Sequence, residues 1–316
     1  MEVRKIQKTG GSTLVVSLPK IWCQNFNLKV GSKVSLNYSE RGAIILEPFE
    51  KSKDNISSTV ELKSTDNLDN DMRILISKYI QGAKKITIKG KSKSSLDYIV
   101  NKFLELTIGF EVIEEKENEA ILEDIISLPT LTFEKALKRM DTLVRSIVRE
   151  SISEQKISKE YVAKKENEVD KFNIYIQRLF NQSLKDYSVL QLNKISTEEA
   201  LAFLLVSRIL ERIADHGVRI YYIAEGEILK KNELLKFIDQ AIQILEQAME
   251  YYFKKDIEGA NNLISKKDYF KIERNNIGSG ISGAEDDLKV AEMLEDAERI
   301  AFYSTDICEL IIDYFQ

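Results

Sequence analysis

The sequence is poor in the residues from which many enzymes and extracellular proteins are built. Its 316 residues include two cysteines, Cys23 and Cys308, and one histidine, His216. Two distant cysteines exclude a disulfide framework and a cysteine-rich zinc site, and they are typical of a reducing cytoplasm. A single histidine leaves little room for histidine catalysis or a histidine-based metal site. We find no Ser/Cys–His arrangement, phosphate-binding glycine loop or cofactor fingerprint, so we expect no enzymatic activity and no organic cofactor.

Proline and long apolar runs are also scarce. The three prolines are Pro19, Pro48 and Pro129, so none interrupts the chain afterwards. Because proline breaks helix interiors, residues 130–316 can be nearly all helical. No apolar run reaches the roughly 18 residues that a membrane span needs, and the first residues lack the apolar core of a signal peptide. We therefore expect a cytoplasmic protein that does not insert into a membrane.

Charge is spread unevenly along the chain. Residues 1–53 hold nine Lys or Arg and four acidic residues, a net charge of +5, whereas the whole chain carries −5. The remaining residues therefore carry −10. A basic head on an acidic body suggests that the head meets a polyanion.

Composition divides the chain into three predicted domains, at residues 1–50, 56–128 and 130–316. The polar stretch from Phe49 to Ser58 is a linker, and Leu128-Pro129-Thr130 is a second boundary. In the first domain, strand-like runs at 3–9, 12–18, 32–38 and 43–47 surround a short helix that follows Pro19. Two hairpins and one short helix bury little core alone, so this domain is expected to dimerise.

The first domain resembles the AbrB/SpoVT family of swapped-hairpin DNA-binding domains. The matching residues are VRKIQKTGGSTLVVSLPKIW, then Leu28, Gly31 and GAIILEP. The resemblance implies a homodimer that holds double-stranded DNA against a basic face. The residues that would contact the phosphates are Arg4, Lys5, Lys8 and Lys20. Arg4 is the best candidate for a base contact, because a guanidinium can pair bidentately with guanine. On their own, these charges could equally be a solvated surface.

Residues 56–128 are predicted to fold as a small α/β two-layer sandwich. Strand patterns at 58–64 and 84–90 alternate with helical patterns at 67–83 and 94–107, and a hairpin follows across Lys116–Glu119. We find no catalytic constellation there. Five lysines cluster in this domain, and they could assist DNA binding or protect a strand edge from aggregation, which is the preferred interpretation. They are Lys84, Lys85, Lys89, Lys91 and Lys93.

Residues 130–316 are predicted to form six helices in two repeats of three. The helices are expected at 131–153, 158–182 and 196–226, then at 231–255, 257–275 and 285–315. The sequence Glu-Arg-Ile-Ala recurs in the third helix of each repeat, at 211–214 and 298–301. Recurrence in the same order indicates an internal duplication.

These helices resemble the PhoU family, whose fold is two three-helix repeats. The residues LERIADHGVRI, 210–220, are close to the family motif acid-Arg-Ile-Gly/Ala-Asp-His. The family binds multinuclear metal clusters through paired acid-x-x-x-acid motifs. In this sequence the matching pairs are Glu166 with Asp170 and Glu211 with Asp215. Carboxylates four residues apart share one helix face. Such donors suit hard cations, namely iron, manganese, magnesium or calcium.

Other interpretations of the residues in and beside this motif stay open. Glu211 and Asp215 could be an exposed stripe that pairs with nearby arginines, and His216 is expected to pack or cap rather than ligate. In the second repeat, Asp268 and Glu298 are followed four residues later by Ile272 and Phe302. We therefore expect the second repeat to bind metal poorly or not at all.

The leading functional hypothesis is a PhoU-like transcriptional regulator. It would bind DNA as a dimer through its head and sense or relay a phosphate or metal-homeostasis signal through its helical body. The alternative is an adaptor that modulates a phosphate transporter or sensor kinase through protein contacts, with the head serving only dimerisation. An antitoxin ranks lower, because short heads of this kind usually precede a brief disordered tail.

Overall fold

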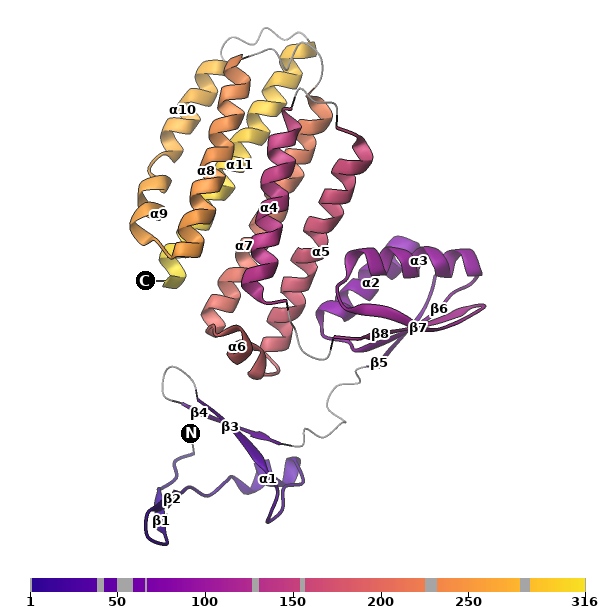
Figure 1. Ribbon diagram of the computed structural model, residues 1–316, viewed down its shortest axis with the longest axis vertical. Coiled ribbons are helices and arrows are strands. Elements are labelled where there is room, and N and C mark those ends of the chain that lie inside the picture. Colours follow the sequence, from indigo (N-terminus) through magenta and orange to yellow (C-terminus); the bar gives the residue numbers. More distant parts are fainter. Residues whose placement is uncertain are drawn as a thin grey trace. The chain divides into compact units, whose positions relative to one another are not determined.

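The computed structural model describes residues 2–38, 43–49, 59–65, 67–126, 131–153, 157–224, 232–278 and 285–315. The chain divides into two compact units, residues 1–57 and 58–316 (Figure 1). The predicted boundaries at Phe49–Ser58 and at Leu128–Thr130 lie almost wholly outside the described residues. Within those residues, no helix combines the length and apolarity that crossing a bilayer requires.

The first unit consists of two hairpins and a short helix, as predicted. Strands β1 (Gln7–Thr9) and β2 (Thr13–Val15) pair antiparallel around Gly10, whose φ of 61° suits glycine. Helix α1 (Lys20–Asn25) follows Pro19, its N-cap residue. Strands β3 (Val34–Tyr38) and β4 (Ile44–Pro48) form a second antiparallel pair. The two hairpins form two separate sheets.

The second unit begins with the predicted α/β sandwich. Its four-stranded sheet has the order β5-β6-β8-β7. Strands β5 (Thr59–Lys63) and β6 (Lys85–Lys89) are parallel, and β7 (Phe110–Lys116) and β8 (Glu119–Asp124) form the predicted hairpin. Helices α2 (Leu68–Ile80) and α3 (Lys93–Leu106) pack together over the sheet. Alternate strand residues such as Ile86, Ile88 and Leu122 are buried, which gives the sheet one apolar face.

Long helices form the rest of the second unit, also as predicted. The first repeat contains α4 (Phe133–Ser151), α5 (Lys159–Ser183) and α7 (Thr197–Ile223), which pack on one another. Their starts are capped by Thr132, Ser158 and Ser196, whose hydroxyls accept backbone N–H groups that have no helical partner. The second repeat contains α8 (Asn232–Lys254), α9 (Ile257–Ile264), α10 (Lys267–Gly278) and α11 (Glu285–Phe315).

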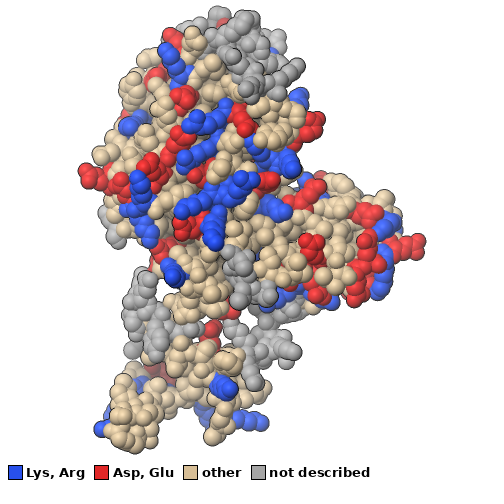
Figure 2. Space-filling model, in the orientation of Figure 1, with Lys and Arg blue, Asp and Glu red and all other residues tan. Residues whose placement is uncertain are grey.

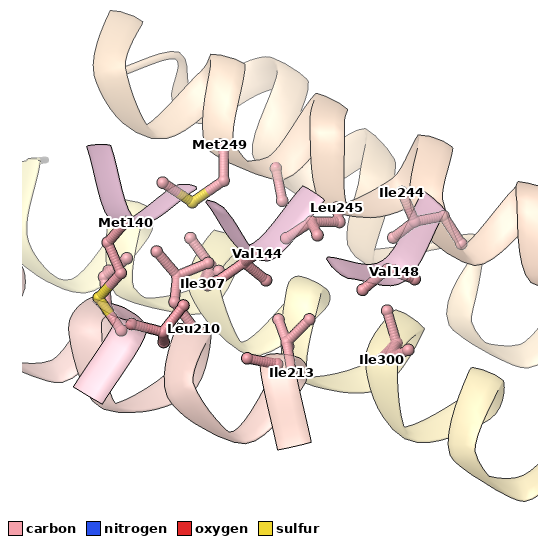
Figure 3. Close-up of a cluster of buried hydrophobic side chains, with 14 of the residues drawn as sticks. Met140, Val144, Val148, Leu210, Ile213, Ile244, Leu245, Met249, Ile300 and Ile307 are labelled. Carbon is pink, nitrogen blue, oxygen red and sulfur yellow. The ribbon is translucent and has the colours of Figure 1, made fainter. Parts of the chain in front are cut away.

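The two repeats share one hydrophobic core. Helix α7 packs on α11, and α4 also contacts α8. Figure 3 shows Val144 and Val148 of α4 meeting Leu210 of α7, Leu245 of α8 and Ile300 of α11. Because the core draws side chains from both repeats, neither repeat is an independent globule.

Two details of the predicted helices were wrong. The single helix expected at 257–275 is two helices, α9 and α10, separated by Ser265 and Lys266. The hydroxyl of Ser265 bonds the carbonyl of Asn262 at 2.7 Å, a local bond that competes with helix continuation. A short helix, α6 (Ser188–Asn193), was not predicted, and it ends at Lys194, whose φ is 54°.

Candidate functional site

Helices α5 and α7 bring the two predicted acidic pairs together. The helices pack on each other, and the Ser207 hydroxyl, which also reaches the Leu204 carbonyl at 2.8 Å, lies 3.2 Å from Oδ1 of Asn173. The pair on α5 precedes Asn173 and the pair on α7 follows Ser207, so the two pairs lie beside each other. We name the set Glu166, Asp170, Glu211 and Asp215 the acidic cluster.

The four carboxylates act on one another electrostatically. Partial burial raises the pKa of Asp170 to about 7, and the charges of Glu211, Glu166 and Asp215 contribute to this shift. The pKa of Glu211 is raised by partial burial and then by Asp215. The pKa of Glu166 rises for the same two reasons, and that of Asp215 rises through burial. The cluster therefore has a repulsion that a cation would relieve.

No described residue neutralises the acidic cluster by a direct contact. None of the four carboxylates forms an ion pair or a hydrogen bond with another described residue. The charges of Arg208 and Arg212 nevertheless act on Glu211 and partly offset the rise in its pKa, so the interpretation as a stripe balanced by nearby arginines stays open. In the side-chain positions of this structure, no three Asp, Glu, His or Cys groups among the described residues converge enough to hold one ion. The cluster fits a cation in charge and donor chemistry, and its side chains would have to converge to bind one.

The corresponding helices of the second repeat carry basic side chains beside their acids. The Nε atom of Arg274 lies 3.9 Å from Oε2 of Glu298. Lys267 lies 5.2 Å from the centre of the Phe302 ring. Asp268 and Ile272 are both exposed. This repeat thus presents mixed charge where the first repeat presents four carboxylates.

His216 joins the two repeats. Its Nδ1 lies 2.7 Å from Oδ1 of Asp296 on α11, and Arg219 Nη1 lies 3.4 Å from the same oxygen. Asp296 is only 1% exposed, and its Oδ2 has no partner among the described residues. His216 therefore packs and bonds across the repeat boundary, while its neighbour Asp215 faces the acidic cluster.

Sequence reasoning missed Asp296, although a signal was present. It lies among the apolar residues Met293, Leu294, Ala297 and Ile300, at a position where the helix pattern requires a core residue. A charged residue at such a position needs a buried partner. Gly217, next to His216, also lies in tight packing, because a Cβ there would lie 2.9 Å from Cγ2 of Val148 on α4.

The predicted DNA contacts are exposed in the first unit. Lys8 is paired opposite Leu14 in the β1–β2 hairpin, and Lys20 begins α1. Arg4 donates to the Ser17 hydroxyl at 2.9 Å and pairs with Glu2. Arg4 and Lys5 precede β1. These residues belong to different local segments of a single copy, and a common basic face stays a prediction.

The lysine cluster of the α/β sandwich is largely neutralised. Lys85 pairs with Glu123 at 2.7 Å, Lys89 pairs with Glu61 at 3.0 Å, and Lys93 pairs with Asp97 at 3.1 Å. These pairs favour the interpretation as a protected, solvated sheet surface over a DNA-binding surface.

A band of basic side chains also crosses the helical body over α4 and α5, as Figure 2 shows. Five of the basic residues on these two helices are paired with carboxylates. The pairs are Lys138–Glu134, Arg139–Glu168, Arg145–Asp141, Arg149–Glu246 and Lys165–Glu150. Their charges are therefore balanced locally.

Comparison with known families identifies two domains in the chain. Residues 7–55 match the family model described as antidote-toxin recognition MazE, bacterial antitoxin, and residues 133–224 match the PhoU domain. The PhoU match spans α4 to α7, which are the helices of the first repeat. No curated protein and no solved structure matches the chain. The chain therefore carries a MazE/AbrB-type domain at its N-terminus and a PhoU domain in its helical body.

Proposed function

We propose that this protein is a DNA-binding regulator that dimerises through its head and responds to cations through its helical body. The observation that carries the proposal is the lack of a core in the head. None of the described side chains between residues 2 and 49 is buried, and large apolar residues such as Ile6, Leu14 and Ile21 are at least 68% exposed. Isolated two-stranded hairpins are marginally stable, so the head requires a partner surface.

A second copy of the head is the partner that best accounts for these features. The two hairpins leave unpaired strand edges that an interleaved copy can complete. The match to a MazE/AbrB-type domain supports the same arrangement. Dimerisation would present two sets of Arg4, Lys5, Lys8 and Lys20, and a doubled basic surface favours binding to DNA phosphates.

The acidic cluster supports the cation-responsive part of the proposal. Glu166, Asp170, Glu211 and Asp215 would hold the ion, which supplies positive charge and accepts their oxygen atoms as ligands. Iron, manganese, magnesium and calcium all suit such donors. A link to phosphate homeostasis rests on the PhoU match alone. A cation could change DNA binding only if it bound the DNA-competent and the DNA-incompetent arrangements of the dimer with different affinities.

Selection of genomic fragments on the purified protein tests this function. Wild type should enrich a few promoter fragments, and the variant R4A/K5A/K8A should lose them. A matched control, K63A/K135A/K271A, removes three exposed lysines outside the head and should keep them. Equal enrichment by both variants, or only sequence-independent binding by wild type, would overturn the proposal. That result would favour the adaptor, in which the head only dimerises.

A further inference from the structure

Helix α10 is held to the second repeat by little buried surface. Of its 12 residues only Phe270 is buried, whereas α5 of the first repeat, with 25 residues, buries seven. Figure 1 shows α10 at the edge of the helical body, where it packs on α8 and α11. On its outer side, Tyr269 is 67% exposed and Ile272 is 59% exposed. Because tertiary packing supplies most of the stability of a helix in a protein, α10 is docked weakly.

One aromatic contact anchors α10 to α8. The ring of Phe270 stacks on the ring of Phe237, with the ring centroids 4.1 Å apart and the planes inclined by 22°. Phe237 is fully buried in this position. Ile277, two turns after Phe270, packs against the core but is only partly buried. Separation of α10 from α8 would therefore uncover a buried aromatic side chain on each helix.

Unpaired polar atoms lie one turn from this stack. Glu273 and Arg274 follow Phe270 by three and four residues, so they share its side of α10. Gln240 of α8 donates to Oε1 of Glu273 at 3.3 Å. The Oε2 atom of Glu273, Nε of Arg274 and Oε1 of Gln240 are shielded from solvent, and none has a hydrogen-bond partner among the described residues. Burial costs such atoms their bonds to water, so they favour the released helix.

The ion pairs between α10 and α11 are long. Nζ of Lys267 lies 3.6 Å from Oδ1 of Asp306. Nε of Arg274 lies 3.9 Å from Oε2 of Glu298. All four side chains keep some contact with solvent, which screens their charges. Such pairs contribute little to stability, so they do not replace the missing apolar burial.

Helix α10 can leave without disturbing the helix before it. Ser265 and Lys266 separate α10 from α9, and α9 has its own buried residues, Ala260 and Leu263. An isolated helix as short as α10 is marginally stable in water. A released α10 would therefore lose its helical hydrogen bonds, while α9 would keep its packing.

We propose that α10 is a releasable strap on the second repeat. It leaves α8 and α11 as a unit, while the other helices of the body stay folded. Release uncovers Phe237 on α8 and separates Glu298 and Asp306 on α11 from their basic partners. The second repeat thereby gains an apolar surface and two free carboxylates. Release needs neither DNA nor a cation, so this inference goes beyond the proposed function and is tested independently of it.

Native-state hydrogen exchange of the full-length protein tests the strap. The protection factors of α10 amides should be at least about tenfold lower than those of α8 and α11, because α10 opens locally. This opening should depend on urea much less than global unfolding does, since it exposes little surface. Exchange of α10 with the same protection and the same urea dependence as α8 would overturn the proposal.

A variant of the aromatic anchor tests whether α10 opens as a separate unit. F270A should lower the protection of α10 further and leave that of α4, α5 and α7 unchanged. Y269A is the matched control, because Tyr269 is the neighbouring aromatic residue and is exposed. It should leave the protection of α10 unchanged. F270L provides the same comparison if F270A does not fold. Equal effects of the Phe270 and Tyr269 variants, or lost protection throughout the body, would contradict the proposal.

A second variant tests the unpaired polar atoms. Q240M/E273M replaces both unpaired acceptors, and the hydrogen bond between the two side chains, with apolar groups of similar size. The protection of α10 should rise several-fold, because the docked helix no longer buries these oxygens. K271M, at an exposed position of the same helix, should leave it unchanged. Lower protection of α10 in Q240M/E273M would show that Gln240 and Glu273 hold the helix in place, and it would overturn their role in release.

Discussion

Nδ1 of His216 lies 2.7 Å from Oδ1 of the buried Asp296, and this contact joins helix α7 of the first repeat to α11 of the second. One residue earlier on α7, Asp215 belongs to the acidic cluster. The two adjacent residues of the motif thus serve different purposes: one supplies a carboxylate to the cluster, and the other fixes the repeat interface.

Replacement of His216 should destabilise the helical body. H216A removes one hydrogen-bond partner of the buried Asp296 carboxylate and leaves Arg219 nearby, and loss of a hydrogen bond to a charged group costs roughly 1.5–3 kcal/mol. Urea unfolding measures the change. R219A is the matched control, because Arg219 is largely exposed and should contribute at most about 1 kcal/mol. Equal effects of the two substitutions would contradict this assignment.

Neutralising Asp170 should stabilise the protein when no metal is present. The pKa of Asp170 is about 7 in the fold, against an ordinary 3.8, so the native state retains a proton that the unfolded chain releases. Stability in EDTA should therefore fall as pH rises from about 4 through 7. D170N should raise the thermal midpoint at pH 8 by ~2–4 °C for each kcal/mol gained, and little at pH 5.

The control for this prediction is Glu168, two residues away on α5. It pairs with Arg139 at 3.1 Å and lies outside the acidic cluster. E168Q should not raise the thermal midpoint at either pH. A loss of stability in D170N at pH 8 would show that the native fold benefits from the Asp170 charge, against our account.

Adding a cation should stabilise the protein, because it relieves the repulsion among the carboxylates of the acidic cluster. Mn²⁺ added to wild type should raise the thermal midpoint, because a ligand that binds only the folded state stabilises it by mass action. E211Q removes a donor of the acidic cluster and should reduce the shift, whereas E298Q in the second repeat should leave it unchanged. Equal losses in both variants would contradict a site confined to the first repeat.

The buried Cys308 should be unreactive in the folded protein. Burial raises the pKa of Cys308 to about 12, and since the thiolate is the reactive form, a thiol reagent should not label it in the folded protein. In a C23S variant, we expect no labelling in buffer and one thiol per chain in urea. Rapid labelling of native C23S would show that the packing of α11 is looser than the structure indicates.

The head should lose its partner when an apolar side chain is replaced by a charge. Leu14 is 68% exposed in a single copy, so we place it in the interface between copies. L14E should shift the protein from dimer to monomer in sedimentation velocity, and S32E, at an exposed polar site, should remain dimeric. A dimeric L14E would place the interface elsewhere.

Much of the fold follows from local pattern. The α/β sandwich and the long helices have clear periodicity and capping residues, so their elements could be predicted to within a few residues. The break at Ser265 and the short helix α6 could not, because no glycine or proline marks them. Local hydrogen bonds and a left-handed Lys194 end these elements instead.

Some residues of the site could likewise be predicted from the sequence, and others could not. The acidic cluster was predicted from the resemblance to the PhoU family, whose paired acidic motifs match two i, i+4 pairs in this sequence, and helix geometry places each pair on one face. The contacts of the buried Arg178 on α5 were not predicted, since its guanidinium donates to the backbone carbonyls of Tyr79 and Ala83, nearly a hundred residues earlier in the chain. A backbone carbonyl has no sequence signature, so an arginine that binds one looks like any solvated arginine.

The salt dependence of DNA binding tests the central claim most directly. Binding of a selected fragment by wild type should weaken steeply with salt, since each neutralised phosphate contributes about 0.9 to the slope of log affinity against log salt. Removing Arg4, Lys5 and Lys8 from both copies should reduce that slope by up to about 5. The same slope in wild type and R4A/K5A/K8A would contradict DNA binding through the head.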